Sequence, residues 1–293
     1  MRVLAAPLNP VDLTVAGGHF FAGHPSLPYI PGVEAVGRVV STDSSAQDRL
    51  VFTCLHGLGT SRDGCCADYA VAPVDRLIPV PDDVEPAIAA AIGTAGLAAW
   101  LPLTWRAPIT PGETVLALGA TGTVGLIAVQ AAKLLGAGRV VAAGRRQEGL
   151  DLAVRLGADA AVQLETASDL AQAFRETCAP TGPTFVFDAL WGEPLVAALG
   201  AAAAGARVVQ LGQSAGATAA IPSALVRGKS LDIRGYTNFG VPFDVLAEGY
   251  SRLVEHVRAG RIHVEVEQVP LEEGAIAWQR QQSGPGTKLV LCP

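Results

Sequence analysis

The chain has 293 residues, half of them apolar and 16% of them charged, with a net charge of −6. This length predicts about two domains that can bury substantial cores. The acidic balance argues against nucleic acid and against an anionic membrane surface as partners, because both require a basic face.

The first ninety or so residues predict a mostly β domain with functional loops. Proline and glycine are frequent over residues 27–40, and the apolar runs 48–52 and 68–73 show no helical periodicity. The N-terminus lacks the basic start and apolar core of a secretory signal, so we expect a cytoplasmic protein. Residues 87–105 carry no charge, but their alanine content and Pro102 favour a buried helix over a membrane span.

Six apolar runs alternate with helix-like segments in the middle of the chain. The runs are residues 114–118, 139–144, 160–164, 184–190, 207–212 and 231–237, and the clearest helices are 123–136 and 147–156. This alternation predicts a doubly wound α/β fold, in which helices cover both faces of a parallel sheet.

The last fifty residues change pattern again. A helical stripe is followed by an expected strand over 263–270, a short helix near 271–282 and a final strand-like run; the stripe consists of Leu246, Tyr250, Leu253, Val254 and Val257. We expect this tail to return to the first domain. The predicted organisation is therefore a first domain of residues 1–95, a second of 96–240 and a return segment of 241–293.

The cysteines predict no disulfide framework and no metal cluster. They show no C-x-x-C spacing and are odd in number: Cys54, Cys65, Cys66, Cys178 and Cys292. We interpret them as free thiols in a reducing compartment.

A glycine-rich segment, "ALGATGTVG" (117–125), follows an expected strand and opens an expected helix. Gly122 and Gly125 hold the second and third glycine positions of the dinucleotide-binding fingerprint, Ala120 stands at the first, and Gly119 precedes it. The N-terminus of the following helix offers N–H groups to phosphates. Between two strands of a six-strand alternation, this segment predicts a pyrophosphate-binding loop.

The end of the next expected strand indicates which dinucleotide binds. NAD-specific proteins carry an acidic residue there for the ribose 2′-OH, whereas this chain has Gly144 followed by Arg145 and Arg146. Two cations and no carboxylate suit a 2′-phosphate, so we predict NADPH. The alternative is that both arginines are the solvated start of a helix.

Several further motifs carry a family resemblance. They are "AAPLNPVDL" (5–13), "LPYIPGVEAVGRVV" (27–40), "PGETVLALGATGTVGLIAVQAAKLLGA" (111–137) and "GTKLVLCP" (286–293). In order and spacing they resemble the medium-chain dehydrogenases/reductases, in particular the zinc-independent quinone reductases of the zeta-crystallin type.

That resemblance implies a GroES-like, mostly β substrate domain and a Rossmann domain that binds NADPH, with the active cleft between them. It implies homodimers joined edge to edge through the last Rossmann strand, and a small-molecule substrate. It also implies further β structure before the first motif, so that the first domain is short at its N-terminus.

We expect no zinc. The zinc-dependent branch of the family needs sulfur and imidazole ligands, and the residues at the matching places are Asp12, Val33 and the pair Gly93 and Thr94. A catalytic zinc requires three protein ligands.

The resemblance also places candidate residues around the reacting ring. Asn9 lies beside the nicotinamide, and segments 211–214 and 237–240 line the ring from the other side. His19 and His24 fall in a loop that could supply the proton, or they are surface histidines.

Other candidates keep two interpretations. Asp12 is either catalytic or binds backbone as a cap, and Lys288 either approaches the cofactor phosphates or is solvated. Phe20 and Phe239 would give apolar walls to the substrate site.

The candidates fall into three groups. The catalytic candidates are Asn9, Asp12 and His19, and the substrate-binding candidates are Phe20, His24 and Phe239. The cofactor-binding candidates are Asn9, Thr94, Gly119, Ala120, Gly122, Thr123, Val124, Gly125, Gly144, Arg145, Arg146, Leu211, Gly212, Gln213, Asn238, Phe239 and Lys288.

The sequence thus predicts an NADPH-dependent, zinc-free oxidoreductase that reduces quinones or α,β-unsaturated carbonyl compounds by hydride transfer. One alternative is a carbonyl/alcohol oxidoreductase on the same scaffold. A second is a non-catalytic NADPH-binding protein, because fold does not imply function.

Overall fold

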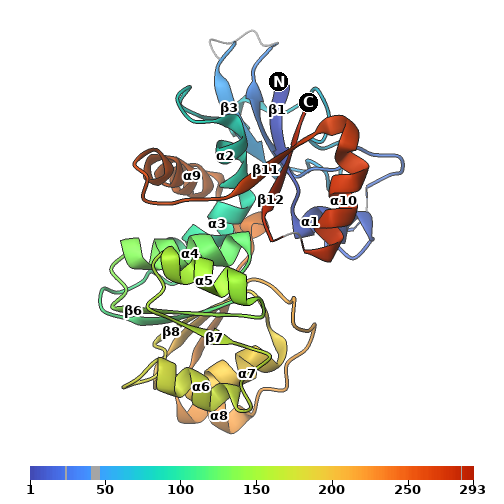
Figure 1. Ribbon diagram of the computed structural model, residues 1–293. Coiled ribbons are helices and arrows are strands. Elements are labelled where there is room, and N and C mark those ends of the chain that lie inside the picture. The colour runs from blue at the N-terminus through green and yellow to red at the C-terminus, as the bar shows by residue number, and fades with distance from the viewer. Residues whose placement is uncertain (24, 41–46, 285) are drawn as a thin grey trace. The chain divides into compact units, whose positions relative to one another are not determined.

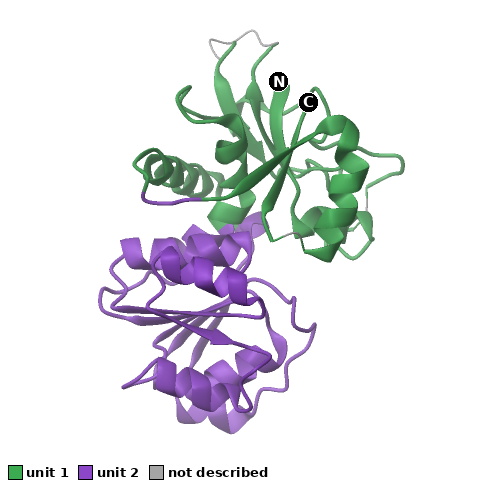
Figure 2. Ribbon diagram, in the orientation of Figure 1, with its two compact units in different colours: residues 1–97, 241–260, 264–293 green, residues 98–240, 261–263 purple. Residues whose placement is uncertain are grey.

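Two sheets, each of six strands, organise the chain in the computed structural model, which describes residues 1–23, 25–40, 47–284 and 286–293 (Figure 1). Unit 1 comprises residues 1–97, 241–260 and 264–293, and unit 2 comprises residues 98–240 and 261–263 (Figure 2). The tail returns to the first unit except for residues 261–263. These three stay with unit 2, where the Gln130 side chain bonds the backbone N–H and carbonyl of His263 at 2.8 and 2.9 Å.

The sheet of unit 1 is assembled from both ends of the chain. Its order is β11-β12-β1-β2-β3-β4, and only β11 and β12 run parallel. The strands are β1 (Arg2–Pro7), β2 (Glu34–Arg38), β3 (Leu50–Cys54), β4 (Ile78–Pro79), β11 (Val266–Pro270) and β12 (Lys288–Cys292). The expected run 68–73 forms no such strand; Tyr69 makes an isolated bridge with Arg2.

Helices complete unit 1 and lead into unit 2. They are α1 (Pro10–Ala16), α2 (Pro86–Ala91), α9 (Phe243–Arg258) and α10 (Gly274–Ser283), with 3-10 turns η1 (Val74–Arg76) and η4 (Leu271–Glu273). The uncharged stretch 87–105 is not one helix: α2 is followed by α3 (Thr94–Leu101) and by a π-helical turn, η2 (Pro102–Arg106). Within the part of the chain that the structure describes, no helix combines the length and apolarity needed to cross a membrane.

The sheet of unit 2 is parallel throughout, with the order β10-β9-β8-β5-β6-β7. Its strands are β5 (Thr114–Leu118), β6 (Arg139–Gly144), β7 (Ala160–Gln163), β8 (Phe185–Asp188), β9 (Arg207–Gln210) and β10 (Asp232–Gly235). The predicted doubly wound fold is confirmed. The order reverses between β5 and β8, and such switch points are where open α/β sheets bind ligands, beyond the carboxyl ends of the strands.

Helices cover both faces of this sheet (Figure 1). One face carries α4 (Thr123–Leu134) and α5 (Gln147–Arg155); the other carries α6 (Leu170–Thr177), α7 (Gly192–Ala201) and α8 (Ser223–Gly228), and η3 (Asn238–Gly240) follows β10. The Lys229 ammonium caps the C-terminus of α7 by donating to the carbonyls of Leu199, Gly200 and Ala202. The two edge strands are β10 and β7, and the expected pairing of β10 with a second copy of the chain stays a prediction.

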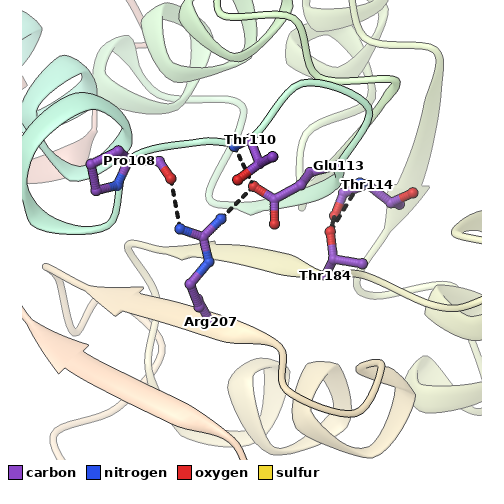
Figure 3. A network of polar contacts seen from close by, with 6 residues as sticks. All are labelled: Pro108, Thr110, Glu113, Thr114, Thr184 and Arg207. Atoms are coloured by element: carbon purple, nitrogen blue, oxygen red, sulfur yellow. Dashed lines mark hydrogen bonds and ion pairs between the residues drawn. The ribbon is translucent and has the colours of Figure 1, made fainter.

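At the amino ends of the strands, an ion pair links β9 to the loop that precedes β5 (Figure 3). Arg207 at the start of β9 donates to Glu113 and, at 2.6 Å, to the carbonyl of Pro108. Glu113 also accepts the N–H of Thr110 at 2.7 Å. The side chains of the pair are only 20% and 15% exposed. The loop that enters β5 is therefore fastened to β9.

Removing Arg207 should leave the half-buried Glu113 carboxylate without its main cationic partner. We expect Arg207→Ala to lower the free energy of unfolding by about 2 kcal/mol, the typical value of a hydrogen bond to a charged group. Thermal unfolding followed by circular dichroism measures this. The matched control is Arg252→Ala, which removes an exposed ion pair with Glu255 and should change stability by about 0.5 kcal/mol or less. Equal effects of the two substitutions would contradict the anchoring role.

Candidate functional site

The loop between β5 and α4 has the backbone geometry of a phosphate-binding turn. Gly119 takes a left-handed conformation, with φ +86°, that residues with a side chain rarely adopt. The N–H groups of Gly119 and Ala120 both donate to the Ala143 carbonyl, at 2.9 and 3.0 Å. The tight turn is therefore made at Gly119, one residue before the position that the glycine fingerprint assigned to Ala120.

The two later glycines of the loop have different reasons to be glycine. At Gly125 a Cβ would collide with the Gly119 carbonyl and lie 2.6 Å from the Ala120 Cα, so this residue lets the helix approach the strand. At Gly122 a Cβ would meet nothing nearer than the Gly119 oxygen, at 3.9 Å. The space over Gly122 is thus open to a ligand, as the close approach of a pyrophosphate requires.

The first turn of α4 supplies donors beside this space. The first backbone bond of the helix runs from the Leu126 N–H to the Gly122 carbonyl, at 2.9 Å. The N–H groups of Thr123, Val124 and Gly125 precede it and belong to the orphan donors of a helix N-terminus, which suit phosphate. A dinucleotide pyrophosphate therefore fits the residues that are present.

The end of β6 lies against the same loop. A Cβ at Gly144 would collide with the Thr121 methyl group, and one at Gly149 would lie 2.6 Å from the Thr121 Cβ. Arg146 donates from Nη2 to the Thr121 carbonyl at 2.6 Å, and Arg145 is exposed. The Thr121 side chain thus fills the corner between β6 and α5, and both arginines emerge beside the phosphate loop.

At the switch point, β8 ends in a carboxylate that the sequence argument did not select. Asp188 is fully buried and accepts the N–H groups of Leu190 and Trp191 at 3.0 and 2.9 Å, and burial raises its pKa. Trp191 is held at φ 59°, a strained value for a tryptophan. The only sequence signal was an acidic residue at the end of an apolar strand. Beside this turn, a Cβ at Gly212 would lie 2.5 Å from the Ala189 carbonyl oxygen.

Unit 1 buries a polar cluster around Asn9. The Asn9 amide nitrogen donates to Glu34 Oε1 at 2.8 Å and to the Pro7 carbonyl at 3.2 Å. Its oxygen accepts from the Lys288 ammonium at 2.6 Å, and Lys288 also donates to the Leu8 carbonyl at 2.9 Å. Burial lowers the pKa of Lys288 and raises that of Glu34. Lys288 is therefore buried rather than solvated, and its ammonium is bonded to Asn9 and to the Leu8 carbonyl; an approach to the cofactor phosphates stays a prediction.

Asp12 acts as a backbone cap. Its two oxygens accept the N–H groups of Asn9 and Val33, at 2.7 and 3.1 Å, which fixes the start of α1 against β2. Burial, followed by repulsion from Glu34, raises its pKa to about 7, although both backbone bonds and the Lys288 charge oppose the shift. Of the two interpretations of Asp12, the structure favours the cap over contact with a substrate.

The remaining candidates are placed unevenly. His19 is exposed, and His24 lies outside the described residues. Phe20 is only 9% exposed and packs on Phe21, with ring centroids 4.4 Å apart, whereas Phe21 is 76% exposed. Phe21 is therefore the more available apolar ring of this loop, and the sequence argument passed over it.

Segments beyond β9 and β10 carry the other candidates of unit 2. Asn238 is buried and accepts a hydrogen bond from the Tyr236 hydroxyl at 2.6 Å, and Phe239 is half-buried. Leu211 and Gly212 are half-buried, and Gln213 is exposed. These positions follow the carboxyl ends of the strands, which is the ligand-binding edge of such a sheet.

The donor set does not fit a catalytic zinc. Both Asp12 oxygens are engaged by backbone N–H groups, and Val33 offers no ligand atom. Among the described residues, no group of three or more His, Cys, Asp or Glu side chains is arranged to hold a metal ion. That the protein works without zinc stays a prediction.

Comparisons with known proteins agree with this architecture. Residues 1–82 match the family model described as alcohol dehydrogenase GroES-like domain, and residues 123–255 match the one described as zinc-binding dehydrogenase. The protein named "Putative quinone oxidoreductase YhfP" of Bacillus subtilis (strain 168) is 30% identical over 266 residues, covering 88% of this chain and 78% of that protein.

Solved structures of similar proteins cover the whole chain. The quinone oxidoreductase from Thermus thermophilus, solved also as a complex with NADPH, is 27% identical with a TM-score of 0.82, and 90% of it is covered. A structure titled as an NAD-dependent alcohol dehydrogenase is also 27% identical, with a TM-score of 0.86, and 90% of it is covered.

The raised pKa of Asp12 predicts a pH dependence of stability. The folded protein binds this proton more tightly than the unfolded chain, where the value is 3.8, so the stabilisation is present below that pH and is lost as the pH rises through about 7. We therefore expect wild-type protein to lose about 2–3 kcal/mol relative to Asp12→Asn between about pH 5 and pH 8. Urea unfolding at a series of pH values measures the difference.

The matched control for this prediction is Asp63→Asn. Asp63 also accepts a backbone N–H, from Ile30 at 2.8 Å, but it is exposed. Its substitution should leave the shape of the stability curve unchanged. Parallel curves for wild type and Asp12→Asn would contradict the assignment.

Proposed function

This chain belongs to the medium-chain dehydrogenase/reductase superfamily, in its quinone oxidoreductase branch, and we propose that it reduces quinones or α,β-unsaturated carbonyl compounds with NADPH. The family models and the relatives support an oxidoreductase of this superfamily. The cofactor form is inferred from residues of this chain, and the substrate class from its similarity to quinone oxidoreductases.

The observation that carries NADPH is the end of β6. Arg145 and Arg146 follow Gly144 directly, without a carboxylate, and Arg146 is already bonded to the phosphate loop at Thr121. A guanidinium held in this way has donors left for an anion, and arginine matches phosphate geometry well. The Thermus thermophilus relative, whose title includes an NADPH complex, supports the same choice.

The chemistry follows from what the cofactor brings and what the chain provides. Bound NADPH would supply a hydride to the β-carbon of an enone or to a quinone, and one proton completes the reduction. The first turn of α4 binds the pyrophosphate, and the two arginines bind the 2′-phosphate. The side-chain carboxamide of Asn9 orients the nicotinamide, and Lys288 and Glu34 fix the position of that carboxamide. The proposed hydride and proton transfers do not involve a metal ion.

The cofactor preference can be tested at the arginines. We expect wild-type protein to bind NADPH much more tightly than NADH, and Arg145→Ala/Arg146→Ala to lose about tenfold to a thousandfold of that preference. NADH affinity should change only about threefold or less, because NADH has no 2′-phosphate. Quenching of tryptophan fluorescence by each cofactor gives the dissociation constants.

Arg155→Ala is the control for the cofactor experiment. Arg155 is an exposed arginine at the other end of α5, so its removal changes the net charge by half as much without touching the phosphate loop. Its NADPH affinity should stay near that of the wild type. Equal affinity of the wild-type protein for NADH and NADPH would overturn the choice of cofactor.

The reaction can be tested by isotope transfer. With NADPH deuterated at the transferred C4 position and an enone acceptor, we expect deuterium on the β-carbon of the product. Mass spectrometry and deuterium NMR of the product locate the label. Quinone reduction is followed separately by oxidation of NADPH, because a proton on a hydroquinone oxygen exchanges with water.

Other outcomes identify the alternatives. Label only on a carbinol carbon would indicate a carbonyl/alcohol oxidoreductase, in line with the similar structure titled as an alcohol dehydrogenase. Tight NADPH binding without turnover of any quinone, enone or carbonyl acceptor would indicate a non-catalytic NADPH-binding protein.

A further inference from the structure

A continuous chain of buried polar groups crosses unit 1 from β12 to α3. Lys288 donates to the Asn9 oxygen, the Asn9 amide donates to one oxygen of Glu34, and the other oxygen of Glu34 accepts the backbone N–H of Thr94. Lys288, Asn9 and Glu34 are 4%, 3% and 0% exposed. The chain therefore joins four elements, β12, the start of α1, β2 and the start of α3, with little exposure to water.

The neighbouring backbone is shaped around the Glu34 carboxylate. A Cβ at Gly93 would collide with Glu34 Oε2 and would lie 2.5 Å from the Phe52 ring. Gly93 is thus glycine because the carboxylate and the ring occupy the place of its side chain. Neither Glu34 nor Gly93 was assigned a role by the sequence argument, although a charged residue within the apolar run "GVEAV" was a signal.

Stability alone gives a poor reason for this arrangement. Taking Lys288 and Glu34 out of water costs as much as their attraction returns, and apolar side chains of similar volume often serve at least as well. A buried charge pair that does not clearly stabilise the fold is better explained by what it orients. Here it orients a carboxamide.

The pair permits only one orientation of the Asn9 side chain. Both Glu34 oxygens accept an N–H, from Asn9 and from Thr94, as an ionised carboxylate does, and the Lys288 ammonium only donates. A flipped amide would therefore place donor against donor and acceptor against acceptor. Both amide hydrogens are used, by Glu34 and by the Pro7 carbonyl. The carboxamide oxygen keeps one lone pair, since Lys288 uses the other. Asn9 can therefore meet a ligand only as a hydrogen-bond acceptor.

We propose that Glu34 and Lys288 are positioning residues for the reaction, which hold Asn9 as an acceptor and fix the N–H of Thr94 at the start of α3. This inference rests on the proposed function, in which Asn9 and Thr94 lie beside the cofactor. The group that Asn9 receives is then a donor, such as the carboxamide N–H of the nicotinamide or a ribose hydroxyl. Misplacing such a contact by about 1 Å can lower turnover about a hundredfold.

A double variant separates positioning from stability. Glu34→Gln leaves the buried Lys288 with only Asp12 as a nearby carboxylate, and Lys288→Met leaves the Glu34 carboxylate without its cation. Each single variant should therefore unfold at a lower temperature and lose turnover. The pair Glu34→Gln/Lys288→Met carries neither charge and should recover most of the lost thermal stability. We expect its kcat to stay about tenfold to a hundredfold below that of the wild type, with an NADPH dissociation constant within about threefold.

A charge pair elsewhere in unit 1 provides the matched control. Glu267 and Arg280 form a bidentate pair between β11 and α10, at 2.7 and 2.6 Å, with both side chains 42% exposed. Glu267→Gln/Arg280→Met should leave kcat unchanged. Recovery of both thermal stability and kcat in the Glu34/Lys288 double variant would overturn the proposal, because the pair would then be merely structural.

A readout without cofactor keeps this test independent of the proposed function. In ¹⁵N-labelled wild-type protein, the Asn9 amide, identified by its loss in Asn9→Ala, should give two resolved, slowly exchanging protons. In the Glu34/Lys288 double variant, exchange should accelerate at least tenfold. If the wild type shows no turnover with any acceptor, the proposed function fails and this amide signal decides the positioning role alone. Unchanged exchange in the double variant would overturn that role.

Discussion

The pairing of β12 with β1 is the contact on which unit 1 and its buried polar cluster depend. Ala6 pairs with Leu291 and Pro7 with Val290, so residues from the two ends of the chain lie side by side in one sheet. This register brings Lys288, at the start of β12, to Asn9, just beyond the end of β1. Without this closure, the Glu34 carboxylate would be buried without a cation, and unit 1 would lack the two strands β11 and β12.

In unit 2 the corresponding constraint is the close approach of the loop after β5 to its neighbouring elements. The loop after β5 passes so close to β6 and α4 that Gly119, Gly125 and Gly144 have no room for, or no conformation suited to, a side chain. Thr121 then fills the corner left by Gly144 and Gly149, and its carbonyl holds Arg146. The same packing therefore makes the phosphate loop and presents the cations beside it. The two properties follow from one set of contacts.

The elements of unit 2 could be predicted closely because their signal is local. Most of its strands are short apolar runs, and β6 begins and ends where the sequence placed it, at Arg139 and Gly144. Unit 1 was harder, because its sheet includes an irregular register between β1 and β2 and a pairing of β1 with β12 from opposite ends of the chain. The run 68–73 has strand composition, but it does not form one of the six strands of the sheet, and Tyr69 makes only an isolated bridge with Arg2.

The backbone geometry of the phosphate loop could be predicted from the sequence, whereas the burial of charged residues near the candidate site could not. A glycine pattern reports a turn directly, so the phosphate loop needed only a shift of the tight turn from Ala120 to Gly119. Whether a charged residue is solvated depends on distant strands, and no local pattern shows that Lys288 is covered. Glu34 and Asp188 were missed for the same reason: each is an ordinary acidic residue in sequence, and its burial appears only in the folded sheet.

The two units offer different kinds of polar group to a ligand. In unit 2, exposed arginines and helix N–H groups would form charge-assisted bonds only when a phosphate arrives. In unit 1 the polar groups are already bonded to one another, so they gain little on binding and serve to restrict orientation. Affinity and cofactor choice should therefore follow the arginines, and the rate of the chemical step should follow the buried cluster. We therefore expect that substitutions in the turn before α5 can change the cofactor preference without disturbing the buried cluster around Asn9.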